Sequence, residues 1–215
     1  MPLQNRVTPS GRLIATQSRG TLMGNRGIIH DPITKTLLTK RWQHQAWVCC
    51  RLAFKDFQHP IMGPGAYTEL FFLDEATALA AGHRPCAYCR RADFNAFKAA
   101  WLDGNVIEAD GFVSVKRIDR QLHKDRVRRT REQIRFTATL ETLPDGVIII
   151  DNECWHLVWG GCLFEWHSNS YGESKPKHSG PVRVLTPRST VAALRTGYCP
   201  GVQESVRHES FGEEP

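Results

Sequence analysis

The stretch that decides the fold is FFLDEATALAAGHRPCAYCRRADFNAFKAAW, residues 71–101, because it holds two cysteines separated by two residues, Cys86 and Cys89. Asp74 is placed to cap a short helix, and Gly82 can end that helix in a left-handed turn. The turn between the cysteines lets both sulfur atoms reach one tetrahedral ion, at a Zn–S distance of about 2.3 Å. We therefore predict a zinc site directly after a short helix.

A second helix is predicted directly after the cysteines, over residues 90–102. Phe94, Phe97 and Trp101 recur within it at the spacing of one helical face, so we expect this face to be buried. The zinc-binding turn with its two flanking helices is called the zinc knuckle below.

The zinc knuckle resembles a known module. Residues 81–86 read Ala-Gly-His-Arg-Pro-Cys, with a second cysteine three positions later, and this pattern looks like the metal-binding module of the adaptive-response (Ada) DNA repair proteins. The resemblance is limited to residues 71–101. It implies a structural zinc bound by four cysteines, one of which can accept a methyl group from a DNA phosphotriester, and it implies DNA as the partner.

The other zinc ligands must come from elsewhere in the chain. Cys49 and Cys50 are adjacent in a strand predicted over residues 46–54, so their side chains point to opposite faces and both can hardly bind the same ion. We expect Cys50 to be the third ligand, although a cysteine here is equally typical of a small buried core residue. We expect His30 to be the fourth ligand, with His83 as its competitor.

A glycine-rich segment, residues 19–31, is the candidate for contact with a phosphate or a flipped nucleotide. Three glycines within eight residues allow the backbone to approach a ligand closely, and Arg19, Asn25 and Arg26 offer hydrogen-bond donors. The alternative interpretation is a glycine-rich turn between two strands.

Two carboxylates are the candidate catalytic residues, with Asn25 as a pocket donor. Asp31 ends the glycine-rich segment, and Glu69 lies among apolar residues in a strand predicted over 67–72. A carboxylate beside a nucleic-acid site can act as a general base. The alternatives are a turn cap for Asp31 and a solvent-facing strand charge for Glu69.

A strongly basic run follows over residues 116–135, in which nine lysines and arginines stand against three acidic residues. Ile118 and Leu122 give it a thin apolar stripe, so we expect one or two helices with a basic exposed face. Such a face neutralises DNA phosphates and releases counterions. The predicted DNA-binding residues of this run are Lys116, Arg117, Arg120, Lys124, Arg128, Arg129 and Arg131.

The composition is that of a globular protein, with a net charge of +6 over 215 residues. The charge is unevenly placed, which favours an acidic polymer such as DNA as the partner. No segment approaches the roughly 18 apolar residues of a membrane span, and the start lacks the apolar core of a signal peptide. We therefore expect a cytoplasmic protein, with no membrane and no obligate protein partner. Seven cysteines, an odd number, favour reduced thiols and metal over disulfides.

We predict an α+β fold with a mixed or antiparallel β-sheet, into which the zinc knuckle is a helical insertion. Residues 1–104 should form a β-containing half that includes the knuckle. Residues 105–215 should form the basic helix, followed by a β-meander and a final helix. The two halves can also form one continuous domain and share one sheet.

The C-terminal half carries the pattern of two hairpins. One is predicted from residues 136–143 to 147–151, and the second from 154–159 to 162–166 across a two-glycine turn. A flexible loop is predicted over 168–180.

These features predict an enzyme of DNA repair or phage defence, namely a zinc-containing DNA glycosylase that removes a modified or damaged base by hydrolysing its N-glycosidic bond. Two other classes of function remain open. One is a non-catalytic, zinc-dependent DNA-binding module, a regulator or damage sensor, which needs the basic run but neither carboxylate. The other is a metal-dependent nuclease, in which His30, Asp31 and Glu69 hold a divalent ion.

Overall fold

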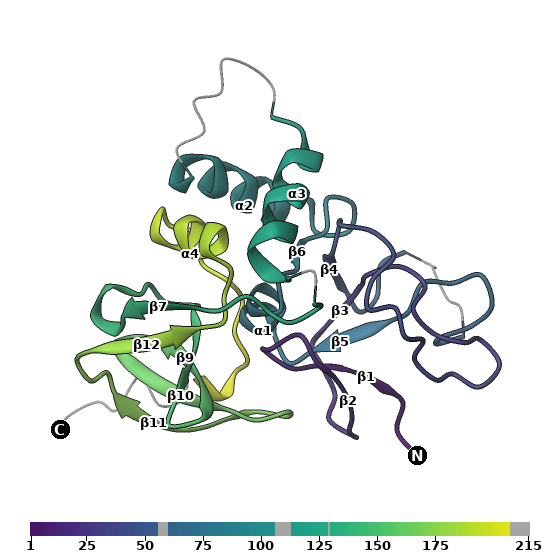
Figure 1. Ribbon diagram of the computed structural model, residues 1–215, viewed down its shortest axis with the longest axis horizontal. Helices are drawn as coiled ribbons and strands as arrows, with labels where there is room; N and C mark the ends of the chain where they lie inside the picture. The colour runs from purple at the N-terminus through teal and green to yellow at the C-terminus, as the bar shows by residue number, and fades with distance from the viewer. Residues whose placement is uncertain (56–59, 106–112, 129, 207–215) are drawn as a thin grey trace.

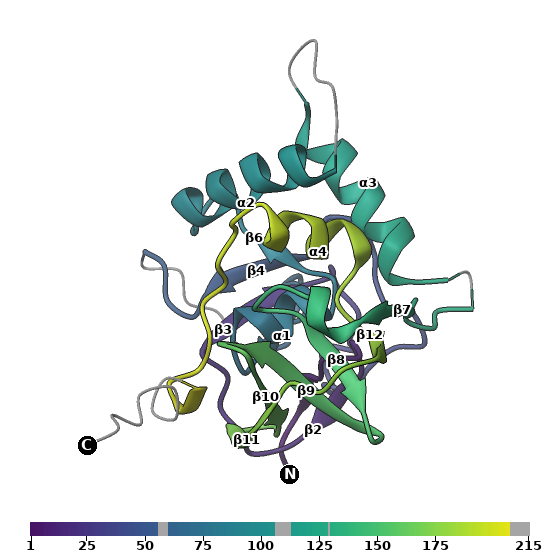
Figure 2. The same ribbon diagram turned by 90° about the vertical axis from the view of Figure 1, so that its left-hand side faces the viewer.

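The computed structural model describes residues 1–55, 60–105, 113–128 and 130–206, and it confirms the predicted α+β class (Figure 1). The described residues form two six-stranded β-sheets and four α-helices. Each half of the chain builds its own sheet, so the halves do not share one. Three of the helices lie together at one end of the molecule (Figures 1 and 2).

The first sheet is mixed. Its strands are β1 (Gln4–Val7), β2 (Leu13–Ala15), β3 (Leu22–Asn25), β4 (Val48–Arg51), β5 (Leu70–Phe72) and β6 (Arg84–Pro85). Their order is β2-β1-β5-β3-β4-β6, in which β1 is parallel to β5 and β4 is parallel to β6. The register places Cys49 opposite Pro85. This parallel pair brings the upstream cysteines beside the zinc knuckle.

The second sheet is antiparallel throughout. Its strands are β7 (Phe136–Thr139), β8 (Ile148–Asp151), β9 (Cys154–Trp159), β10 (Cys162–Trp166), β11 (Tyr171–Pro176) and β12 (Pro181–Val184). Their order is β11-β10-β9-β8-β12-β7. The β9–β10 hairpin is confirmed, and Gly160 and Gly161 adopt φ angles of +54° and +79°, as a primed turn requires.

Two predictions for this sheet are wrong. Residues 136–143 do not pair with 147–151, because β12 lies between β7 and β8 and pairs with both. The three isoleucines of β8 are at most 7% exposed, so β8 is a central strand whose backbone needs partners along both edges. The loop predicted over 168–180 contains β11, which extends the sheet beyond β10.

The helices are α1 (Glu75–Ala80), α2 (Arg91–Gly104), α3 (Val115–Arg126) and α4 (Arg188–Arg195), with a 3₁₀ turn, η1 (Leu140–Thr142). α2 confirms the second helix of the zinc knuckle, and its Phe94, Phe97 and Trp101 are buried. Phe97 meets Tyr198 beyond α4 with ring centres 5.2 Å apart. None of the helices formed by the described residues has the length and apolar character needed to cross a membrane.

The basic run is helical only in its first part, because α3 ends at Arg126. Beyond it the chain folds back on itself: the N–H of Arg128 donates to the carbonyl of Glu132 at 2.9 Å, and that of Ile134 to the carbonyl of Arg126 at 3.0 Å. These bonds replace the helical ones that a longer helix would form. The arginines after α3 therefore project from an irregular segment.

α1 lies between the two sheets, and every one of its residues is buried. Asp74 caps it as predicted, and Gly82, just beyond its end, adopts a φ of +82°. Ala78 packs in the core of the first sheet, while Ala76 and Ala80 pack in a core of the second. The small side chains let both sheets approach the helix closely.

Side chains of the C-terminal sheet hydrogen-bond to the start of α1. The hydroxyl of Tyr171 donates to Oδ2 of Asp74 at 2.9 Å, and Nε1 of Trp166 donates to Oγ1 of Thr77 at 3.0 Å. These buried bonds connect the two halves of the chain.

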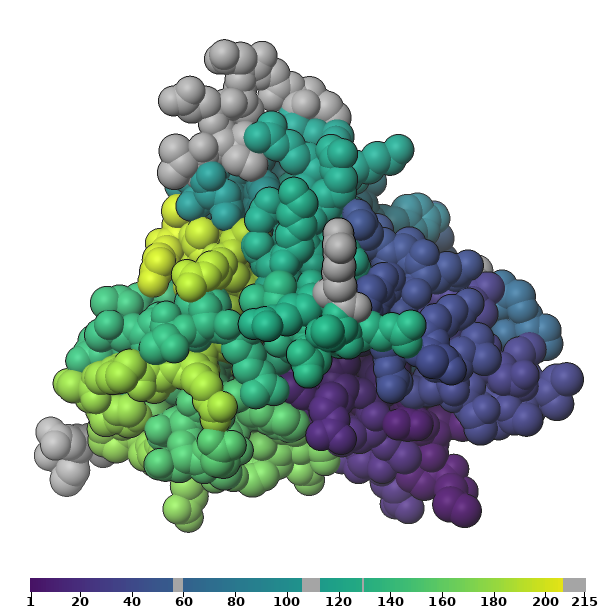
Figure 3. Space-filling model, in the orientation of Figure 1, coloured from purple at the N-terminus to yellow at the C-terminus, as the bar shows by residue number. Residues whose placement is uncertain are grey.

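The chain after α3 lies against both halves of the molecule (Figure 3). Nε2 of Gln133 donates to the carbonyls of Pro9 at 3.0 Å and Ala80 at 3.1 Å. Nη1 of Arg131 donates to the carbonyl of Thr39 at 2.9 Å. Arg131 and Gln133 thereby hold this segment beside the N-terminal loops.

Candidate functional site

Cys50, Cys86 and Cys89 form a cluster in which all three sulfur atoms lie within 4.8 Å of one another. The pairing of β4 with β6 produces this approach, because the N–H of Cys86 donates to the carbonyl of Cys49 at 2.9 Å. A tetrahedral ion with Zn–S distances of about 2.3 Å holds its sulfurs about 3.8 Å apart. The three cysteines are therefore close enough to hold a metal ion.

The three thiols differ in acidity. The thiol of Cys50 donates to the sulfur of Cys86, which lowers the pKa of Cys86 to about 5, and the N–H of Tyr88 points at the same sulfur from 3.4 Å. The hydrogen bond to Cys86 raises the pKa of Cys50, and burial raises the pKa of Cys89. The lowered pKa of Cys86 favours the thiolate, which is the form that binds metals.

Cys49 points away from this cluster, as the alternation of strand side chains predicts. It is 1% exposed, and its sulfur accepts a hydrogen bond from Nη1 of Arg90 at 3.6 Å. Burial raises the pKa of its thiol. Cys49 is a core residue here.

The structure does not place His30, the expected fourth ligand, in the cluster. Its Nδ1 lies 2.6 Å from Oγ1 of Thr68, and its Nε2 lies 3.3 Å from the carbonyl of Gly63. The loop after β3 carries it to an isolated bridge with Leu37 instead. Among the described residues, no fourth histidine, cysteine or acidic side chain joins the three cysteines.

The predicted catalytic residues serve their own loops. Oδ1 of Asp31 accepts the N–H groups of Ile33 at 2.9 Å and Thr34 at 2.8 Å, and this turn lowers the pKa of the carboxyl. Glu69 is 3% exposed, and its Oε2 accepts the N–H of Met62 at 2.7 Å. Oδ1 of Asn25 likewise accepts an N–H of its own turn at 3.3 Å.

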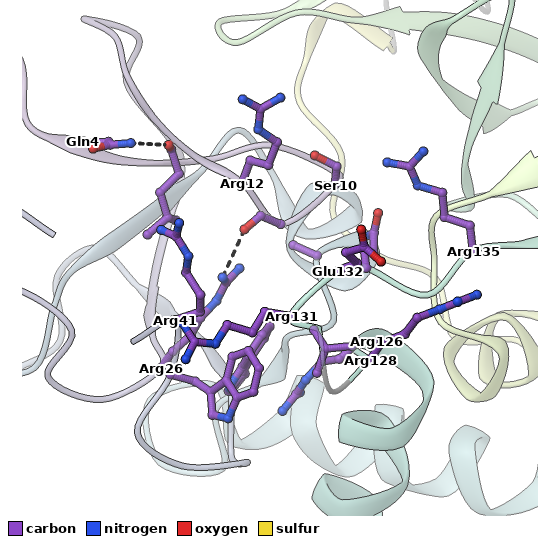
Figure 4. A pocket seen from close by; sticks show the side chains of 17 residues that line it. Gln4, Ser10, Arg12, Arg26, Arg41, Arg126, Arg128, Arg131, Glu132 and Arg135 are labelled. Atoms are coloured by element: carbon purple, nitrogen blue, oxygen red, sulfur yellow. Dashed lines mark hydrogen bonds between the residues drawn. The ribbon is translucent and has the colours of Figure 1, made fainter. Parts of the chain in front are cut away.

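A cavity of about 720 Å³ opens between the N-terminal loops and the chain after α3 (Figure 4). Small-ligand pockets have volumes of roughly 300–1,000 Å³. Of the 17 described residues that line it, seven are arginines and one, Glu132, is acidic. The arginines are Arg12, Arg26, Arg41, Arg126, Arg128, Arg131 and Arg135. We call it the arginine cavity.

Arg26 and Arg126 form the floor of the arginine cavity. They are 3% and 1% exposed, whereas the other five arginines are exposed and form its rim. Their guanidinium carbons lie 4.1 Å and 3.8 Å from the ring centre of the buried Trp47. Stacking on this ring fixes both planar groups in place.

Neutral groups hold Arg26. Its Nε donates to Nε2 of His83 at 3.0 Å, and its Nη1 donates to the carbonyl of Gly11 at 3.0 Å. Burial lowers the pKa of His83, so the ring is neutral, with Nδ1 as the donor to the carbonyl of Val48 at 3.1 Å. Nη2 of Arg26 has no hydrogen-bond partner among the described residues. Burial, with the neighbouring Arg41, lowers the pKa of Arg26 to about 9.

Arg126 is held in the same way. Its Nη1 donates to the carbonyl of Gly82 at 2.7 Å, and its Nη2 donates to the carbonyl of Gln45 at 2.6 Å. Its buried Nε has no partner in the described part of the chain. Burial and the nearby Arg26 lower its pKa.

The floor of the arginine cavity therefore carries two positive groups that form no ion pair with a carboxylate of the described residues, and of the two Arg126 feels the charge of Asp119, which is bound to Arg84. Within the described residues, every ion pair with a carboxylate involves other cations. A buried charge without a counter-charge destabilises the fold. An anion in the cavity would relieve this cost and occupy the free N–H groups.

One short stretch joins the arginine cavity to the cysteine cluster. Gly82 holds Arg126, His83 holds Arg26, and Cys86 belongs to the cluster. A Cβ atom on Gly82 would lie 2.4 Å from Cδ of Arg126, so only glycine fits. The zinc knuckle thus shapes the cavity floor.

The predicted DNA-binding residues fall into two groups in the structure, those that line the arginine cavity and those that lie outside it. Those that line the arginine cavity are Arg26, Arg128 and Arg131. Those that are exposed outside it are Arg19, Lys116, Arg117, Arg120 and Lys124. Arg129 lies outside the described residues.

Sequence reasoning missed four arginines of the cavity and its two tryptophans. The missed arginines are Arg12, Arg41, Arg126 and Arg135. A signal was present at Arg41-Trp42 and Trp47, since basic residues interleaved with aromatic ones are typical of nucleic-acid surfaces.

No protein-family model, no curated protein and no solved structure matches this chain. The interpretation of the cysteine cluster and the arginine cavity therefore depends on their own geometry.

Proposed function

We propose that this protein binds DNA and holds its phosphates in the arginine cavity. The observation that carries the proposal is the buried pair Arg26 and Arg126, which among the described residues has N–H groups without an acceptor and no ion pair with a carboxylate. Arginine is the residue best suited to phosphate, because its planar fork donates two parallel hydrogen bonds. The five rim arginines extend the same chemistry to the protein surface.

Two neighbouring features favour a polymer over a small anion. The side chains of Lys116, Arg117 and Lys124 on α3 are exposed and add positive charge outside the cavity. Trp42, which is partly exposed, lines the cavity and can stack on a base. A DNA strand can thus make more contacts than inorganic phosphate.

In this proposal the cysteine cluster binds zinc as a structural metal. Three thiols within 4.8 Å suit a tetrahedral thiophilic ion, and zinc would hold the turn of Cys86 and Cys89 against β4. The metal would act on DNA binding only through the fold. The proposal therefore takes the form of a zinc-dependent DNA-binding module.

A DNA glycosylase is the second candidate, and one observation favours it. Glu132 is the carboxylate that lines the arginine cavity, whereas neither Asp31 nor Glu69 does so. If the protein is a glycosylase, Glu132 is the residue placed to activate water or face the sugar cation. Abasic-site formation on modified DNA that disappears in Glu132→Gln would support this candidate.

Fluorescence anisotropy with labelled DNA tests the binding proposal. Arg12→Ala combined with Arg128→Ala removes two rim arginines, and Arg91→Ala combined with Arg195→Ala removes two exposed arginines outside the cavity. Only the first pair should weaken binding, and it should reduce the slope of log K against log salt by up to about 0.9 for each duplex phosphate that the protein no longer neutralises. Equal affinity and slope in both pairs would contradict the proposal.

A further inference from the structure

We infer that the floor of the arginine cavity receives the terminal phosphate of a DNA strand, a phosphate monoester, in preference to an internal phosphodiester. This inference rests on the proposed DNA binding and adds the chemical class of the group that is recognised. Three observations carry it: the depth of the floor, its charge and its unused donors.

The depth of the floor separates the two kinds of phosphate. Arg26 and Arg126 are 3% and 1% exposed, while the rim arginines are exposed. An internal phosphodiester has a nucleoside on each side, so it reaches the rim but not a buried floor. A terminal phosphate projects from the strand and can enter the cavity alone.

The charge of the floor also matches a terminal phosphate. Arg26 and Arg126 bring two positive charges, and the groups that hold them are the imidazole rings of His83 and His123 and backbone carbonyls. A phosphodiester carries one negative charge, whereas a phosphate monoester carries about −1.5 to −2 at pH 7. The monoester therefore comes closer than the diester to compensating both guanidinium groups.

The two N–H donors of the floor that have no partner among the described residues belong to different arginines, so they need more than one acceptor oxygen. Nη2 of Arg26 and Nε of Arg126 are the buried donors without partners in the described residues of the floor. A terminal phosphate offers three free oxygens, and a phosphodiester offers two that must also face the rim. Trp47 and the bound carbonyls hold the two side chains, but both nitrogens are buried in this structure, so neighbouring side chains must move before a phosphate oxygen can reach them.

The experiment compares oligonucleotides of one sequence that carry a 5′-phosphate, a 3′-phosphate or hydroxyl groups at both ends, with a fluorophore attached internally. We expect one phosphorylated end to bind about tenfold tighter or more than the hydroxyl form, and inorganic phosphate to compete for that preference. The two phosphorylated oligonucleotides show which end enters.

Two variants separate the floor from the rim. Arg26→Lys keeps the positive charge but removes the fork, so it should abolish the preference for a phosphorylated end while the rim still binds DNA. Arg12→Ala should weaken all three oligonucleotides by the same factor. If Arg26→Lys does not fold, the wild-type comparison and the phosphate competition decide the question.

The outcomes distinguish this inference from the proposed function. Equal wild-type affinity for phosphorylated and hydroxyl ends overturns the inference and leaves DNA binding intact. Absence of binding to any oligonucleotide overturns both, even if inorganic phosphate raises the melting temperature. An unchanged end preference in a folded Arg26→Lys variant also overturns the inference.

Discussion

At the scale of single residues, the direction of the side chain decides which cysteines can hold a metal. Cys50 lies on one face of β4, and Cys86 and Cys89 lie in the turn after β6, whereas Cys49 lies on the opposite face of β4. Cys86→Ser should lower zinc content from about one ion per chain to near zero and lower the melting temperature, because a hydroxyl replaces a thiolate ligand. Cys49→Ala should keep the zinc and lose only core packing. Elemental analysis of both purified variants measures this, and zinc retained in Cys86→Ser would refute the assignment.

Substitutions of Asp31 and Glu69 test whether these two carboxylates act only in their own loops. Asp31→Asn should leave stability nearly unchanged, because the amide oxygen still accepts the two N–H groups of its turn. Glu69→Gln should cost about 1–3 kcal/mol, because its buried bond to Met62 loses a charged acceptor. Urea unfolding and DNA anisotropy check both, and a loss of DNA affinity without a loss of stability would place these residues in the site.

The residue-scale predictions from sequence were good where local geometry decides them. Alternation along a strand separated Cys50 from Cys49, and the two-residue spacing brought Cys86 to Cys89. His30 could not be placed, because its position depends on a loop that closes on Thr68 and Leu37.

At the scale of elements, the end of α1 controls the position of Arg126. Gly82→Ala should destabilise the protein by about 1–3 kcal/mol and weaken DNA binding, because the added Cβ would lie 2.4 Å from Cδ of Arg126 at a φ of +82°. Gly197, which also follows a helix, has a φ of +100° and no atom within 4 Å of an added Cβ.

Gly197→Ala is therefore the matched control, since it adds the backbone strain without displacing an arginine. It should lower stability by less than Gly82→Ala does, because nothing lies against the added Cβ, and it should leave DNA affinity unchanged. Urea unfolding and anisotropy on both variants give the comparison. If both glycine variants bind DNA as the wild type does, Arg126 does not need its present position.

The elements themselves were predicted best where the signal is local. The cap at Asp74 and the two-glycine turn of β9–β10 follow from turn chemistry. The end of α3 could not be predicted from local sequence. The helix-favouring sequence after Arg126 is overridden by bonds from Gln133 to Pro9 and Ala80. The sequence predicts a strand over residues 182–185, which β12 confirms, but not its place between β7 and β8, since it pairs across a long sequence separation.

At the scale of the whole molecule, α1 and its cap link the two sheets, and we expect them to unfold together. Tryptophan fluorescence and far-ultraviolet circular dichroism should give coincident urea transitions. Tyr171→Phe should shift the common transition by about 1–3 kcal/mol, because it removes the buried bond to Asp74. Tyr88→Phe, at a residue that is 64% exposed, should shift it by less than about 0.5 kcal/mol. Two separate transitions would show that the halves fold independently.

The arginine cavity could not be predicted from the sequence, because its walls come from residues as far apart as Arg12 and Arg135. Only the folded chain brings the N-terminal loops to the segment after α3. The excess of basic residues in the chain predicted a positive surface, but not that Arg26 and Arg126 would be buried within it.

The stretch from Gly82 to Cys86 would make a metal at the cysteines and an anion in the arginine cavity thermodynamically linked ligands. If zinc at Cys86 stabilises the positions of the Gly82 carbonyl and the His83 ring, it raises the affinity of the cavity for phosphate. Bound phosphate must then raise the affinity of the cysteines for zinc by the same coupling factor. Titrations of each ligand with and without the other measure both factors, and a factor of one would mean that the sites are independent. A factor above one would let the supply of zinc in the cell set how strongly the protein holds DNA.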